Sequence, residues 1–147
     1  MAQIISYPLA TPVSTDYVVG TQKSTTGAPI NPTKNFTVDS VVSAGLGYTV
    51  YTALLTQTGN NAPSATILKN NTNATLTWSR VASGDYNVTA SSNLFTNNKT
   101  LVFVNAGSHS NTHNVYWERV SDTVVKIKTH NTDDDLTNAS FEVRIYS

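Results

Sequence analysis

The sequence predicts an all-β fold, an antiparallel β-sandwich of about eight strands preceded by an extended N-terminal arm. Composition is the first reason: only 12% of the 147 residues are charged and 39% are hydrophobic, while Thr, Asn, Ser and Val are abundant. Thr and Val favour strands, whereas Asn and Ser favour turns. The second reason is periodicity, because no window sustains helical spacing over three turns.

Residues 1–47 are predicted to form the arm. Proline fixes φ and removes a backbone donor, so this stretch should run extended with turns and pack on another surface instead of forming its own core. The alternative is a disordered tail, against which the apolar clusters at 4–5, 17–19 and 36–38 count as anchors. Four prolines support the prediction: Pro8, Pro12, Pro29 and Pro32.

Residues 39–47 mark the boundary, either as one short helical turn or as a linker that two glycines close. Beyond it, residues 48–147 should form the β-sandwich domain. Strand-like runs follow one another about 8 to 14 residues apart, as in a sandwich or barrel. They cover 48–57, 65–68, 75–81, 86–90, 100–105, 114–120, 124–130 and 140–146.

Alternation within several runs predicts one apolar face and one wet face, as in antiparallel sheets packed on one side. Ser83-Gly84 and Ser121-Asp122 should be hairpin turns between such runs. The side chains expected to face the core are Leu76, Trp78, Val115, Trp117, Phe141, Val143 and Ile145.

Charge and cysteine content exclude several classes of partner and of bound metal. Basic and acidic residues number nine each, and no basic stripe could follow a phosphate backbone, so nucleic acid is not an expected partner. The absence of cysteine excludes disulfides and thiolate metal sites. No signal peptide or membrane helix is evident, which predicts synthesis in a cytoplasm without membrane insertion.

The histidines and the acidic run suggest no cofactor or metal. His109 and His113 lie in a Ser/Asn-rich stretch without helical character, and with His130 they are expected to be solvated loop residues, the alternative being a zinc or nickel site. Asp133 to Asp135 either lie in solvent or share a cation such as calcium.

Catalysis is not expected. The chain has no cysteine nucleophile and no Gly-x-Ser-x-Gly elbow. Glu118 and Glu142 are the only glutamates, and both fall on predicted outer strand faces. A hydrolase that uses these two carboxylates is the alternative.

Four tyrosines could build a stacking platform for a sugar, although core or subunit-interface positions are the commoner use of tyrosine. They are Tyr48, Tyr51, Tyr116 and Tyr146.

Two sets of segments resemble known proteins. The segments Tyr7-Pro8-Leu9-Ala10-Thr11-Pro12, Asp16-Tyr17-Val18-Val19-Gly20-Thr21 and Asn31-Pro32-Thr33-Lys34-Asn35-Phe36-Thr37-Val38 resemble the N-terminal arm of fibre and other structural proteins of phages and prophages of Bacteroidetes-type bacteria. The later segments Tyr51–Gln57, Ala62–Thr66, Trp78–Arg80, Gly84–Tyr86 and Glu142–Tyr146 resemble the small β-domain that accompanies such arms.

The resemblance implies a virion structural protein, a fibre, spike or capsid decoration subunit. Its arm would dock on other virion proteins of the capsid or tail, and its β-domain would project outward, with a host-surface glycan as a candidate ligand. Such proteins are often homotrimers. The alternative is a carbohydrate-binding module or adhesin. The docking candidates that match the arm's pattern are Tyr17, Gly20, Asn31, Pro32, Lys34 and Phe36.

Overall fold

A computed structural model describes residues 11–22, 33–105, 115–129 and 136–147, and the chain divides into two compact units, Met1–Leu46 and Gly47–Ser147. The N-terminal unit contains β1 (Tyr17–Thr21), β2 (Thr33–Thr37) and α1 (Val38–Leu46). Strands β1 and β2 pair antiparallel into a two-stranded sheet. The arm predicted to be extended therefore also holds a helix.

Helix α1 is longer than the single turn or linker that the sequence suggested, since it spans nine residues. Its start is capped, because the Oγ1 of Thr37 accepts a hydrogen bond from the backbone N–H of Ser40 at 3.2 Å. Asp39 in the first turn suits the positive end of the helix dipole. Gly47 follows the helix with φ +68°, the left-handed conformation in which many helices end. These local signals mark both ends of a helix of about two and a half turns.

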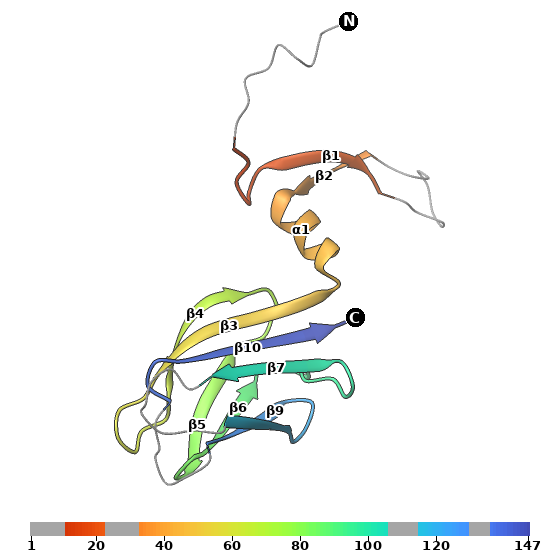
Figure 1. Ribbon diagram of the computed structural model, residues 1–147. Coiled ribbons are helices and arrows are strands. Elements are labelled where there is room, and N and C mark those ends of the chain that lie inside the picture. The colour runs from red at the N-terminus through yellow and green to blue at the C-terminus, as the bar shows by residue number, and fades with distance from the viewer. Residues whose placement is uncertain (1–10, 23–32, 106–114, 130–135) are drawn as a thin grey trace, which may run out of the picture. The chain divides into compact units, whose positions relative to one another are not determined.

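The second unit is a β-sandwich of two four-stranded antiparallel sheets, which confirms the predicted fold class (Figure 1). One sheet has the strand order β4-β3-β10-β7 and the other β5-β6-β9-β8. The strands are β3 (Tyr48–Thr56), β4 (Ser64–Asn70), β5 (Leu76–Ala82), β6 (Asp85–Ala90), β7 (Thr100–Asn105), β8 (Val115–Arg119), β9 (Val124–Thr129) and β10 (Ala139–Tyr146). Each coincides with one of the predicted runs within a few residues.

The core lies between the inner faces of the two sheets. Phe141 from β10 is fully buried and makes edge-to-face contacts with two other aromatic rings. Its ring centroid is 5.1 Å from that of Trp78 in the opposite sheet and 6.2 Å from that of Tyr51 on the neighbouring strand. The predicted core face is confirmed at Leu76, Trp78, Phe141 and Val143, which are buried, while Val115, Trp117 and Ile145 pack half-buried against the same cluster.

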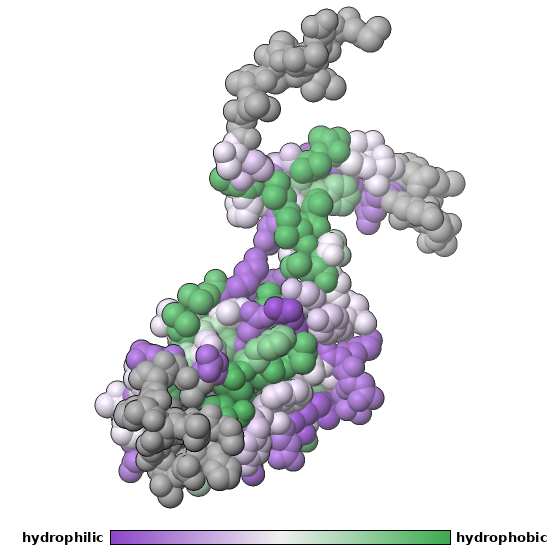
Figure 2. Space-filling model, in the orientation of Figure 1, coloured by the Kyte–Doolittle hydropathy of each residue, from purple (hydrophilic) through white to green (hydrophobic). Residues whose placement is uncertain are grey.

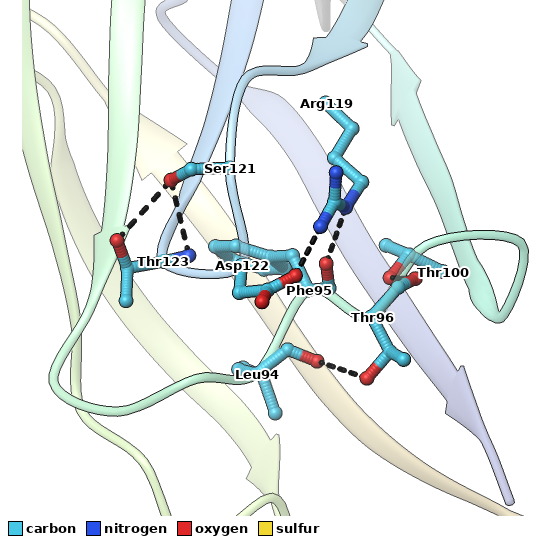
Figure 3. A network of polar contacts seen from close by, with 8 residues as sticks. All are labelled: Leu94, Phe95, Thr96, Thr100, Arg119, Ser121, Asp122 and Thr123. Carbon is cyan, nitrogen blue, oxygen red and sulfur yellow. Dashed lines mark hydrogen bonds and ion pairs between the residues drawn. The ribbon is translucent and has the colours of Figure 1, made fainter.

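Arg119 ties two connections of the sandwich together (Figure 3). Its Nε donates to the carbonyl of Phe95, and a terminal nitrogen of its guanidinium pairs with the Asp122 carboxylate. The backbone N–H groups of Leu94 and Phe95 both donate to the carbonyl of Asp122, at 2.8 and 2.7 Å. Since Leu94 and Phe95 are buried, this network holds the β6–β7 connection over the core.

Gln57 connects the two sheets through its buried side chain. Its Oε1 accepts hydrogen bonds from the Tyr86 hydroxyl at 2.9 Å and from the Leu136 N–H at 3.1 Å. Its Nε2 donates to the carbonyl of Gly59, and its own carbonyl accepts from the Thr137 hydroxyl. One polar residue thereby joins the end of β3, strand β6 and the segment that leads into β10.

Tyr51 is a core tyrosine whose hydroxyl has no hydrogen-bond partner among the described residues. Burial raises its pKa above the ordinary value of 10.0, so the folded protein holds this proton more tightly than the unfolded chain. The protonated Tyr51 side chain therefore makes its full contribution to the free energy of unfolding below pH 10, and this contribution declines as the pH rises above 10.

We expect Tyr51→Phe to leave the free energy of unfolding at neutral pH unchanged or to raise it by up to about 1 kcal/mol, because a desolvated hydroxyl is removed. The variant should also lose less stability than the parent above pH 10. Urea denaturation at pH 7 and at alkaline pH measures both effects. A destabilisation greater than about 1 kcal/mol at pH 7 would show that the hydroxyl is hydrogen-bonded.

Candidate interaction surfaces

Four of the six predicted docking residues lie on the β1–β2 hairpin of the N-terminal unit. Tyr17 and Gly20 belong to β1, and Lys34 and Phe36 belong to β2. Asn31 and Pro32 lie outside the described residues. In the antiparallel register Gly20 is opposite Lys34, so these two share one face of the hairpin with Phe36, while Tyr17 is on the other face.

Gly20 has a packing role in this hairpin. A Cβ at this position would lie 3.3 Å from the ring of Phe36, closer than most side-chain contacts allow. The absence of a side chain therefore leaves room for the Phe36 ring to lie over β1. The structure brings Gly20 and Phe36 together as a unit, and their docking role stays a prediction.

The N-terminal unit exposes much of its apolar surface and buries none of the residues described within it. Tyr17 is 71% exposed and Val19 is 68% exposed on the same hairpin face. Helix α1 adds exposed apolar side chains at the spacing of one helix face. Figure 2 shows hydrophobic residues on β1 and α1. We call this set the arm surface: Val13, Tyr17, Val18, Val19, Val41, Val42 and Leu46.

The outer face of the sheet β4-β3-β10-β7 carries a stacked arginine. The guanidinium carbon of Arg144 on β10 lies 5.1 Å from the ring centroid of Tyr48 on β3 and 4.9 Å from that of Phe103 on β7. Tyr48 also contacts Tyr146, with ring centroids 5.3 Å apart. The arginine is therefore held between aromatic side chains of the two strands that flank its own, in cation–π geometry.

Glu142, two residues before Arg144 on β10, also holds the arginine side chain in place. Its Oε1 accepts from the Nε of Arg144 at 2.6 Å, and its Oε2 accepts from the Thr52 hydroxyl at 3.1 Å. The hydrogen bond to Glu142 is the main reason that the pKa of Arg144 is raised above its ordinary value, so the guanidinium stays charged. Both side chains are partly exposed, and solvent can reach them.

A groove of about 620 Å³ opens beside this ion pair, at the edge where β7 and β8 meet. Its walls combine aromatic, aliphatic, neutral polar and charged side chains. Phe103 is 48% exposed, and Trp117 contributes a second aromatic ring. The lining residues are Thr52, Val102, Phe103, Val104, Asn105, Val115, Trp117, Ser140, Phe141, Glu142 and Arg144.

The outer face of the other sheet is different in character. Lys126 on β9 pairs with Asp85 on β6 at 3.5 Å, and Lys128 lies 6.0 Å from the ring centroid of Tyr116. The outward positions of β5 and β6 are mostly Thr, Ser, Asn and Asp. This face resembles an ordinary solvated surface, and the aromatic groups of the first sheet mark it as the better candidate for recognition.

The structure separates the four tyrosines for which a sugar-stacking platform was the alternative to core or interface positions. Tyr51 is buried in the core, Tyr116 lies on the second sheet, and only Tyr48 and Tyr146 contact each other. A platform of all four is therefore wrong. Sequence reasoning missed Phe103 and the stacking of Arg144, although the alternation of strands 100–105 and 140–146 places both residues on outer faces.

The two glutamates lie on different sheets, Glu118 on β8 and Glu142 on β10, and each is on the outer face of its sheet. They are not brought together as the flanking pair that glycoside hydrolysis requires. His109, His113, His130 and Asp133 to Asp135 lie outside the described residues. Within the described ranges, no three His, Asp or Glu side chains are grouped to hold a metal ion.

Over the same ranges no helix is long and apolar enough to cross a membrane. Comparison with protein-family models, with curated proteins and with solved structures found no match to this chain.

Proposed function

We propose that this chain is a structural subunit of a bacteriophage particle, a fibre, spike or capsid decoration protein. In this proposal the N-terminal unit attaches to other proteins of the capsid or tail, and the β-sandwich is displayed. The protein would be made in the host cytoplasm and would reside in the virion, as a homo-oligomer for which the resemblance of its arm favours a trimer.

The observation that carries the proposal is the arm surface. A small unit that leaves side chains such as Tyr17 and Val19 about two-thirds exposed gains little free energy from burial, at roughly 25 cal/mol per Å² of apolar area. Covering these side chains with a partner protein supplies the missing burial and couples the ordering of the unit to assembly. Helix α1 of the same unit adds three exposed apolar side chains, Val41, Val42 and Leu46.

The sandwich suits display because it has its own buried core and does not need the arm to complete it. The neutral, Thr- and Asn-rich composition limits nonspecific electrostatic adhesion. Repetition around a symmetric particle would make weak individual contacts sufficient, since linked sites bind at high effective concentration.

The test locates the protein on particles and then disrupts the arm surface. Particles are purified from bacteria that carry the phage or prophage, with the gene replaced by a tagged copy, and are labelled with an antibody against the tag. We expect labelled particles for the parent chain and loss of at least nine-tenths of the label for Tyr17→Ser combined with Val19→Ser.

The matched control places the same kind of change on the sandwich, Leu54→Ser combined with Ile67→Ser, at side chains that are also exposed. This variant should remain on particles. Absence of the parent chain from particles, or full incorporation of the Tyr17/Val19 variant, would refute the proposed function. Light scattering on the purified chain gives its mass, and a monomeric mass would refute the trimer.

A further inference from the structure

The groove beside Arg144 has the features of a small-molecule site. Its volume of about 620 Å³ falls within the roughly 300–1,000 Å³ common for ligand sites. In such sites apolar side chains bury most of the ligand, and a few polar groups fix its orientation. Phe103 is exposed on the outer face of β7, Val102 and Val104 of the same strand face the core, and Val115 and Trp117 of β8 complete the apolar part of the lining.

The polar groups of the groove are preorganised. Arg144 is stacked between Tyr48 and Phe103, and its Nε–H is bonded to Glu142. A guanidinium has five N–H donors and a carboxylate has about four acceptor positions, so the pair can still donate to and accept from a ligand. Because the side chains are already oriented, binding costs less conformational entropy.

Charge decides which ligand class fits. Glu142 and Arg144 are the charged side chains in the described lining, and they neutralise each other through a 2.6 Å hydrogen bond. An anionic ligand would have to compete with Glu142 for the guanidinium. A neutral, hydroxyl-rich ligand instead finds a donor and an acceptor side by side, with the amide of Asn105 and the hydroxyl of Ser140 in the same lining.

From this lining we infer that the groove beside Arg144, which residues of β3, β7, β8 and β10 line, binds a neutral saccharide. One sugar face packs on the ring of Phe103, and its hydroxyl groups hydrogen-bond to Glu142 and Arg144. This inference concerns a ligand of the sandwich and goes beyond the proposed attachment through the arm surface. The saccharide site and the particle attachment can each fail alone, because saccharide binding is measured on the purified chain and attachment is measured on particles.

The test uses the full-length chain on a printed array of neutral and sialylated oligosaccharides, followed by calorimetric titration of the strongest neutral binder. We expect saturable binding of neutral glycans that weakens at least tenfold in Phe103→Ala. The matched control is Tyr116→Ala on the other sheet, since Tyr116 and Phe103 are both 48% exposed. Tyr116→Ala should bind as the parent does.

A second variant tests the charge argument. Glu142→Gln keeps the shape of the side chain and leaves Arg144 without its carboxylate, so preference on the array should shift from neutral toward sialylated glycans. Thermal unfolding of each variant verifies that it is folded. No binding on the array, equal binding by Phe103→Ala, or a parent preference for sialylated glycans would each overturn the inference.

Discussion

Replacing Phe141 by alanine should destabilise the sandwich by about 3–5 kcal/mol, the usual cost of removing a buried aromatic side chain. Phe141 is fully buried and contacts both Trp78 of the opposite sheet and Tyr51 of its own sheet. The cavity left by alanine would separate rings that now meet edge to face, so packing is lost in addition to the transfer free energy. Since a whole domain is stable by only about 5–15 kcal/mol, this is a large part of the total.

Urea denaturation monitored by tryptophan fluorescence measures the effect. The matched control is Phe103→Ala, because Phe103 on the adjacent strand β7 is 48% exposed and points away from the core. The control should cost less than about 1 kcal/mol. If Phe141→Ala is too unstable to purify, Phe141→Leu should still lose roughly 1–2 kcal/mol. Equal losses at positions 141 and 103 would contradict the placement of the core.

Gln57→Leu should cost roughly 2–4 kcal/mol, although it replaces a buried polar side chain by an apolar one of similar size. Its Oε1 accepts from two buried donors, the Tyr86 hydroxyl and the Leu136 N–H. Leucine offers no acceptor, so both donors would stay buried without a partner. The free energy that this costs exceeds what is gained by removing a buried polar side chain. The link between the two sheets is removed at the same time.

A double-mutant cycle separates this effect from simple packing. Tyr86→Phe alone should cost about 1 kcal/mol, because Gln57 still accepts from Leu136. In the Gln57→Leu background the same change should cost less, which gives a coupling of about 0.5 kcal/mol or more between the two residues. Additive losses measured by thermal and urea unfolding would show that the Tyr86–Gln57 hydrogen bond does not contribute to stability.

The predictable parts of the fold are those that depend on short-range sequence pattern. The alternation in 75–81 and 140–146 placed Leu76, Trp78, Phe141 and Val143 on the core face, and all four are buried. Gly84, with φ +66°, closes the β5–β6 hairpin at the predicted Ser83-Gly84 turn. Such features depend on neighbours in the chain, so a single sequence contains them. Helix α1 was underestimated because its nine residues are too few to show sustained periodicity.

The candidate site was predicted only in part, for a different reason. The sequence placed Tyr48, Glu142, Arg144 and Tyr146 on strands, but it did not show that β3, β10 and β7 are adjacent. The pairing of β10 with β7 and β3 joins residues 35 to 98 positions apart, from Ser140 with Asn105 to Tyr146 with Tyr48, and no local pattern specifies such pairings. The alternative of a single platform built by four tyrosines is wrong for that reason, since Tyr51 faces the core, the commoner place for a tyrosine, and Tyr116 belongs to the other sheet.

The sequence by itself therefore determined the fold class, the strand positions and the two faces of each strand, because these follow from the two-residue repeat of a strand and from turn chemistry. Only the tertiary structure decided that Arg144 is stacked between Tyr48 and Phe103, that Glu142 and Glu118 lie on different sheets, and that Gln57 joins the sheets. The physical reason is that long-range strand pairing is set by the burial of the whole core, to which each residue contributes only a small share of the free energy.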